Sequence, residues 1–164
     1  MEMSTILLHS FVASLSTLVV GFIWYNPKVF GTIWMRETGM TEEKAKKSNM
    51  GMVFAMAIFY GFLISFVLHM MTIHQFGAYG MIGGDPMAAD IKPSFNAFMA
   101  GYGNEFRTFK HGAFHGFWAG LLFALPDVGT GALFEQRSWK YTLVSGGYWG
   151  VSCMLMGANG CGWE

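Results

Sequence analysis

Two long runs without a charged residue constrain the fold of this chain more than any other feature. They cover residues 5–25 and 51–73, and neither contains Asp, Glu, Lys or Arg. A helix over the first run is about 31 Å long, which is enough for a hydrocarbon core of about 30 Å. Because lipid offers no hydrogen-bond partner to a bare backbone, each run predicts a membrane-spanning helix. The residues before the first run lack the basic region of a secretory signal, so this helix is expected to be retained.

The composition supports the same class of protein. Hydrophobic residues make up 53% of the 164 residues and charged residues only 12%, roughly half the charged share of soluble domains. A chain of this kind cannot cover a soluble surface with polar groups, so membrane lipids are its expected partners. The formal net charge is zero, which removes any electrostatic case for a nucleic acid partner.

Two further spans are predicted over residues 112–134 and 142–158. Small residues recur at helical spacing along each of the four runs and form one seam per helix, which lets helix backbones approach closely in lipid. The expected fold is therefore all-α: one membrane domain over residues 1–164, a tight bundle of four transmembrane helices. The seams are Ser10, Ser14, Thr17 and Gly21; Ala57, Gly61, Ser65 and His69; Gly112, Gly116, Gly120 and Ala124; and Gly146, Gly150, Cys153 and Gly157.

Residues 74–111 form the long connection of the chain. Its first half, residues 77–86, is irregular by composition. The second half carries one apolar stripe at helical spacing, which predicts an amphipathic helix lying in the plane of the membrane interface. The stripe consists of Phe95, Phe98, Met99, Tyr102, Phe106 and Phe109. At the other extreme of the chain, residues 159–164 are polar and glycine-rich, and we expect a flexible end there.

The basic residues predict the orientation. Residues 26–50 hold five Lys or Arg, and Arg137 and Lys140 add two between the third and fourth spans. The opposite side holds three, namely Lys92, Arg107 and Lys110. By the positive-inside rule both short loops are cytoplasmic, and both termini and residues 74–111 lie outside.

An aromatic, proline-broken corner closes the first span. Trp24 and Tyr25 precede Pro27, which ends the helix, and Trp34 follows in the basic loop. Trp139 occupies the equivalent place before the fourth span. We expect these aromatic residues to form a belt at the inner membrane surface and the two corners to stack on each other.

Several motifs together resemble a family of small bacterial membrane proteins catalogued as domain of unknown function seventeen sixty-one. The resemblance implies four transmembrane helices and a bacterial inner membrane, and it implies no activity. In the first half it rests on Trp24-Tyr25-Asn26-Pro27, Phe30-Gly31, Trp34-Met35 and Asn49-Met50. In the second half it rests on Leu133-Phe134-Glu135, Arg137-Ser138-Trp139-Lys140, Gly147-Tyr148-Trp149 and Met156-Gly157-Ala158.

With alternating helix directions, all five histidines fall at the outer side. His111 and His115 share a helix face at spacing i, i+4, and His69 and His74 end the second span. Such a pair with one more imidazole is an acceptable zinc or copper site, and two imidazoles from facing helices could ligate haem. The favoured alternative is that the histidines hydrogen-bond between helices or face lipid headgroups, so no cofactor is predicted.

Asp127 is the one acid that could sit inside a span. If the third helix continues past Pro126 to Phe134, Asp127 is an intramembrane carboxylate and a candidate for an ion path. The favoured alternative is that the helix ends at Leu125 and Asp127 caps it at the interface.

No nucleophile–base pair, phosphate-binding loop or HExxH motif occurs, so the chain is not expected to be an enzyme. The favoured function is that of a structural or accessory subunit of a larger bacterial membrane complex. The first alternative is a small oligomeric transporter or channel. The second is a metal- or haem-binding membrane protein built on the outer histidines.

Overall fold

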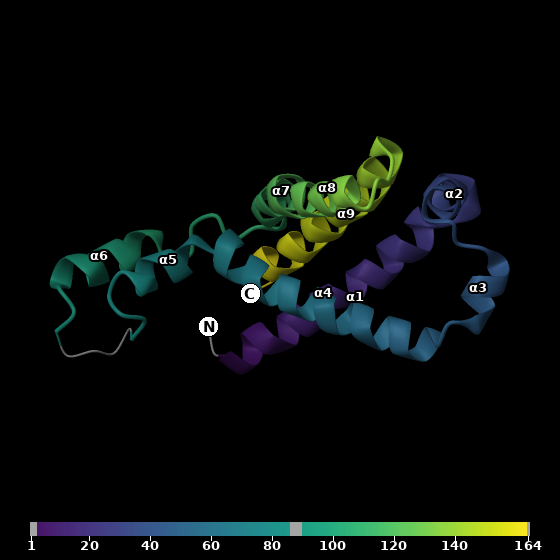
Figure 1. Ribbon diagram of the computed structural model, residues 1–164. Helices are drawn as coiled ribbons and strands as arrows, with labels where there is room; N and C mark the ends of the chain where they lie inside the picture. Colours follow the sequence, from purple (N-terminus) through teal and green to yellow (C-terminus); the bar gives the residue numbers. More distant parts are fainter. Residues whose placement is uncertain (1–2, 86–89, 164) are drawn as a thin grey trace.

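The computed structural model describes residues 3–85 and 90–163, and this part of the chain is helical without a strand (Figure 1). Five long helices dominate it: α1 (Met3–Trp24), α4 (Met50–Thr72), α7 (Phe109–Ala119), α8 (Leu125–Phe134) and α9 (Trp139–Gly162). A π-turn, η2 (Gly120–Ala124), joins α7 to α8 without a break. The remaining elements are η1 (Pro27–Gly31), α2 (Thr32–Thr38), α3 (Glu42–Lys47), α5 (His74–Gly80) and α6 (Pro93–Tyr102).

Three of the helices are long and apolar enough to cross a membrane: α1, α4 and the continuous helix Phe109–Phe134. They lie within a few residues of the predicted runs 5–25, 51–73 and 112–134. The 24-residue helix α9 has the length of a span. It is less apolar than the other three, which are the candidate spans in the described part of the chain.

The fourth helix is longer than the predicted range 142–158. It begins at Trp139, where the Ser138 side chain accepts the backbone N–H groups of Lys140 and Tyr141. It ends at Gly162 instead of fraying, so the expectation of a flexible end from residue 159 is wrong for residues 159–162. Arg107 explains this end: its guanidinium donates to the carbonyl oxygens of Cys161 (3.2 Å) and Trp163 (3.4 Å), which are otherwise open at a helix C-terminus.

The seams predicted from small residues lie at helix contacts. Ser10, Ser14 and Thr17 of α1 are buried where it crosses α4. A Cβ added to Gly61 of α4 would lie 3.3 Å from the Thr17 side chain, so the two backbones are close. The hydroxyls of Ser14 and Thr17 donate to carbonyls one turn earlier in α1, which satisfies them within their own helix.

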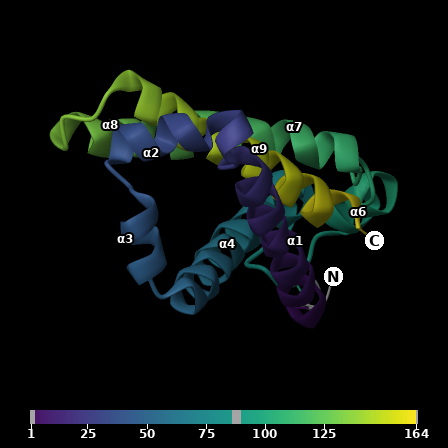
Figure 2. The ribbon, with the colours of Figure 1, turned by 90° about the vertical axis from the view of Figure 1, so that its right-hand side faces the viewer.

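Glycines let α7 and α9 approach each other closely. A Cβ at Gly112 would lie 2.1 Å from the carbonyl oxygen of Gly157, and one at Gly116 equally close to that of Cys153. Figure 2 shows α9 lying along the continuous α7–η2–α8 helix, with α1 and α4 crossing and descending from that layer. The buried residues of α4 all lie between Gly61 and Thr72, so its second half packs more closely than its first.

The connection 74–111 contains two helices. The seven-residue α5 occupies part of the stretch that was predicted to be irregular, and α6 lies within the predicted stripe. α6 ends at Tyr102, so Phe106 and Phe109 do not continue it; Phe106 has a left-handed backbone (φ 62°) and Phe109 opens α7. Both helices project away from the long helices (Figure 1). Residues 86–89 of this connection lie outside the described residues.

Candidate metal centre

Three histidines converge where α4 ends and α7 begins. His111 and His115 lie one turn apart on α7, which starts early because the Thr108 side chain accepts the backbone N–H of His111. His74 is the first residue of α5. The extended backbone at Ile73 (φ −98°, ψ 99°) ends α4 and lets α5 take a new direction, which brings the His74 ring to α7.

The nitrogen atoms of these three rings form a compact group. The Nε2 atoms of His74 and His111 are 3.0 Å apart, and one ligand atom from each of the three residues lies within 4.8 Å of the others. Two imidazole nitrogens bound to one tetrahedral zinc ion at 2.0–2.1 Å are roughly 3.3 Å apart. The His74–His111 pair is therefore close to ligand spacing, and His115 must approach by roughly 1.5 Å to complete it.

The surroundings of the three histidines are aromatic on the protein side and open on the other. The Phe106 ring packs on His111 at 5.2 Å, and Phe114 meets His115 edge-on at 5.5 Å. His74 is exposed, and it lines a cavity of about 220 Å³ together with the exposed residue Glu105. A carboxyl-bearing residue thus shares the cavity beside His74, the one exposed member of the three histidines.

His69, the fourth residue predicted for a metal site, lies elsewhere. It is 1% exposed in the core, and its Nδ1–H donates to the carbonyl oxygen of Ser65 at 2.8 Å, with the hydroxyl of Ser10 at 3.3 Å. A Cβ at Gly160 would meet this ring at 2.7 Å, so α9 packs directly on it. For His69 the structure agrees with the predicted alternative of hydrogen bonding between helices. His9 likewise stacks on Trp163 at 4.8 Å.

Asp127 lies within a continuous helix, because α7, η2 and α8 run without a break to Phe134. The favoured expectation of an interfacial cap after Leu125 is therefore wrong. Asp127 is exposed and lines an open groove of about 670 Å³ between α4 and the η2–α8 segment. It is far from the histidines along its helix, twelve residues beyond His115.

The aromatic corner is a structural feature with well-defined contacts. The Trp24 indole N–H donates to the carbonyl oxygen of Val144 in α9 at 2.9 Å, and Tyr25 packs on Trp34 (5.4 Å) and Tyr148 (5.2 Å). Asn26 caps η1 with its side chain, and Pro27 opens it.

Trp139 does not pack in this corner. It is 68% exposed, and its ring makes a cation–π contact with the ammonium group of Lys140. The two short loops meet through polar groups and not through stacked rings. Ser138 donates to the Glu37 carboxylate at 2.5 Å, and Arg137 donates to the Glu37 carbonyl at 3.4 Å. The hydrogen bond from Ser138, and then that from Arg36, lowers the pKa of Glu37.

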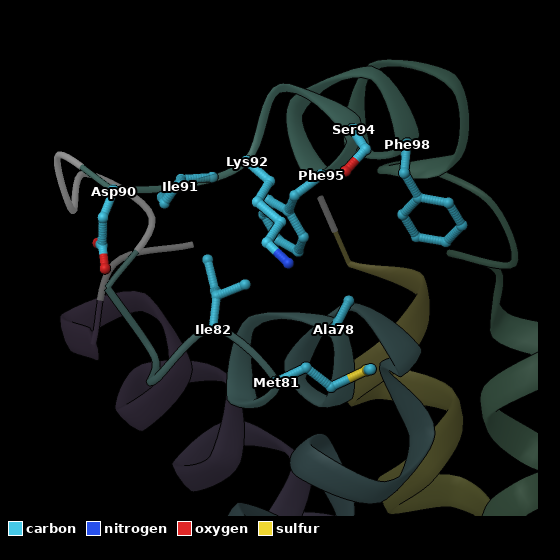
Figure 3. A pocket seen from close by; sticks show the side chains of 9 residues that line it. All are labelled: Ala78, Met81, Ile82, Asp90, Ile91, Lys92, Ser94, Phe95 and Phe98. Atoms are coloured by element: carbon cyan, nitrogen blue, oxygen red, sulfur yellow. The ribbon is translucent and has the colours of Figure 1, made fainter.

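A further hollow of about 680 Å³ lies between α5 and α6 (Figure 3). Its walls are mainly apolar, and the Lys92 side chain extends between Ile82 and Phe95 while Asp90 lies at its edge. Lys92 is exposed, so this hollow is a cleft between two surface helices and not an enclosed site.

Sequence reasoning missed the aromatic and acidic surroundings of the histidines. Phe106 was assigned to an amphipathic stripe, but its left-handed backbone turns the chain between α6 and α7. Glu105 carried no spacing signal, because its proximity to His74 arises from the fold of the 74–111 connection.

The sequence matches a family described as protein of unknown function (DUF1761) over residues 8–159. The chain belongs to the DUF1761 family. The matched range includes His74, His111, His115 and Asp127, so the candidate sites lie in the part shared with DUF1761. The family description assigns no activity, and comparison with curated proteins and with solved structures gives no match.

Proposed function

We propose that the protein is a four-span membrane protein that binds a transition-metal ion through His74, His111 and His115. The observation that carries the metal proposal is the convergence of three imidazoles from α5 and α7 within 4.8 Å. The proposed role is binding and not catalysis, with membrane lipids covering the many exposed apolar side chains.

The fourth span in this proposal is α9. Its 24 residues correspond to about 36 Å of helix, which is sufficient for the hydrocarbon core. Apart from Val144 and Met156, its buried residues are small or polar, and α9 packs against α1, α4, α7 and α8, so lipid meets little of its polar surface. This packing accounts for an apolar content below that of the other three helices.

The proposed location is the bacterial inner membrane. The five Lys and Arg residues of the 26–50 segment, with Arg137 and Lys140, favour a cytoplasmic aromatic corner. Both termini then lie outside, together with the three histidines and the α5–α6 connection.

The ligand set favours zinc, copper or nickel over haem. Neutral imidazole suits these divalent ions, and three histidines leave the fourth position of a tetrahedral ion open for water or a small ligand. A haem iron between two histidines needs their nitrogens roughly 4 Å apart on opposite sides of the ring. The direct 3.0 Å contact of His74 and His111 fits a single small ion better.

The test is metal titration of the full chain, purified in mild detergent without a histidine tag and stripped with a chelator. Wild-type protein is expected to bind one Zn²⁺ per chain, and Co²⁺ is expected to give the visible spectrum of a tetrahedral site. His111→Ala should weaken binding at least about a hundredfold, since one of three protein ligands is lost.

His9→Asn is the matched control, because this histidine lies outside the cluster, and it should bind metal as wild type does. Failure of the wild type to bind one equivalent would contradict the proposal. Equal binding by the double variant His74→Ala, His111→Ala would place the metal elsewhere and contradict it as well.

An accessory subunit of a larger membrane complex is the second candidate, and the first half of α4 favours it. The residues from Met50 to Tyr60 include no buried position, and Figure 2 shows this half running away from α8. A helix of another subunit placed there would complete the bundle. If so, Phe54→Ala should release a polypeptide that purifies with the chain, whereas Phe22→Ala on the exposed face of α1 should not.

A further inference from the structure

The groove between α4 and the η2–α8 segment combines an apolar wall with a single charge. Leu63, Val67 and Met71 of α4 form one side, and Phe123 and Val128 form the other. Among the described residues that line it, only Asp127 carries a charge. Asp127 makes no ion pair with another described residue, so its carboxylate is available to a ligand.

The helix is built in a way that turns Asp127 into this groove. In η2 the Leu125 backbone N–H donates to the Gly120 carbonyl, five residues earlier, and Pro126 follows without a donor of its own. The wide turn relieves the clash that a proline ring makes with the preceding turn. One additional residue in the turn also rotates the following helix by about 100°. Asp127 therefore faces α4 in a register that an unbroken α-helix would not give it.

The depth of Asp127 matters for what could bind there. It lies seven residues before the end of the helix at Phe134, which corresponds to about 10 Å. A carboxylate at this depth in a lipid-exposed groove is costly unless a cation or a proton compensates it. The described residues place no ion-pairing cation at Asp127, so the compensating group comes from outside them.

Aromatic rings add a second element of recognition. Phe123 and Trp149 line the same groove, one from η2 and one from α9. Aromatic faces attract organic cations, most strongly when the cation is desolvated. Apart from the buried thiol of Cys153, the remaining lining residues are apolar, and a hydrophilic ammonium ion would not use their contacts.

We propose that this groove binds a lipophilic organic cation, with Asp127 as its counter-ion and Phe123 and Trp149 against its apolar body. Charge complementarity selects a cationic head, and the apolar walls select a hydrophobic body. This site is independent of the three histidines, and its existence does not rest on metal binding.

The experiment measures binding of radiolabelled tetraphenylphosphonium to the full chain in detergent, by equilibrium dialysis. Wild-type protein is expected to bind it saturably, close to one per chain. Asp127→Asn keeps the shape of the side chain and removes the charge, so it should weaken binding at least about tenfold. Asp90→Asn, which removes a carboxylate outside the groove, is the matched control and should bind as wild type does.

Two more measurements separate charge from shape. Triphenylmethanol, a neutral probe of similar bulk, should bind wild type and Asp127→Asn equally. Ala124→Leu fills the groove and keeps the carboxylate, so it should weaken binding of both probes. Absence of saturable binding to wild type, or equal tetraphenylphosphonium binding by Asp127→Asn, would overturn the proposal. If Asp127→Asn fails to fold, unchanged binding by Ala124→Leu would overturn it instead.

Discussion

Gly112 and Gly116 lie where α7 touches the backbone of α9, and this contact leaves no room for a side chain. A Cβ at Gly112 would lie 2.1 Å from the Gly157 carbonyl oxygen, which is backbone and cannot rotate away. We therefore expect Gly112→Ala to push the helices apart and to cost about 1–3 kcal/mol of stability. Gly131→Ala on α8 is the control, because nothing lies within 4 Å of its Cβ position. Thermal unfolding in detergent should show a lower midpoint for the first variant and no loss for the second.

Glu37 is the residue from which we expect a pH dependence. Its pKa lies below the ordinary value of 4.5 because Ser138 and Arg36 donate to the carboxylate in the folded protein. Its stabilising contribution is therefore present at pH values above about 4.5. It is lost as the pH falls through the lower pKa of the folded state.

Glu37→Gln should accordingly lower the unfolding midpoint at pH 7 and reduce its further decrease between pH 5 and pH 3. Glu42→Gln, an exposed carboxylate on α3, should behave like wild type at both ends of this range. An equal acid response in wild type and Glu37→Gln would show that the contact with Ser138 does not contribute.

At the scale of elements, the Trp24 corner joins α1 to α9 through one hydrogen bond. Trp24→Phe removes the indole donor to Val144 and keeps an aromatic ring, so we expect a loss of about 1 kcal/mol. For a chain of this size that corresponds to a decrease of about 2–4 °C in the unfolding midpoint. Trp139→Phe, at the exposed ring, should change stability by less than about 0.5 kcal/mol. Similar losses in both variants would show that Trp24 is not a specific tie.

The sequence predicts the helices well where hydrophobicity and small-residue spacing agree. The runs 5–25 and 51–73 correspond to α1 and α4 almost residue for residue, because no proline or charge interrupts them. The C-terminal bound of α9 was missed, since Gly160 and Gly162 resemble loop residues. They are helical because His69 and Phe109 pack against them so closely that larger side chains would clash. Such a cause lies in the tertiary contact and not in the local sequence.

For the molecule as a whole, the position of the candidate metal centre could be predicted in part from the sequence. Alternating helix directions suffice to bring His74, His111 and His115 to one end of the molecule, and the i, i+4 spacing aligns two of them. The same argument wrongly included His69, because helix direction does not tell which side of α4 faces α1 and α9. The groove around Asp127 could not be predicted from the sequence, because it depends on the π-turn before Pro126 and on how α4 packs beside it.

The number of spans decides the arrangement of the whole molecule. The side of the membrane on which Trp163 lies distinguishes three spans from four. Four spans place residues 81 and 163 on one side of the membrane and residues 46 and 135 on the other. Single cysteines at these positions can be labelled with a membrane-impermeant maleimide in spheroplasts, and both native cysteines are buried, which keeps the background low. Met81→Cys and Trp163→Cys should react from outside, whereas Lys46→Cys and Glu135→Cys should react only after permeabilisation. If Trp163→Cys were protected together with Glu135→Cys while Met81→Cys reacted, α9 would not cross and the three-span arrangement would hold.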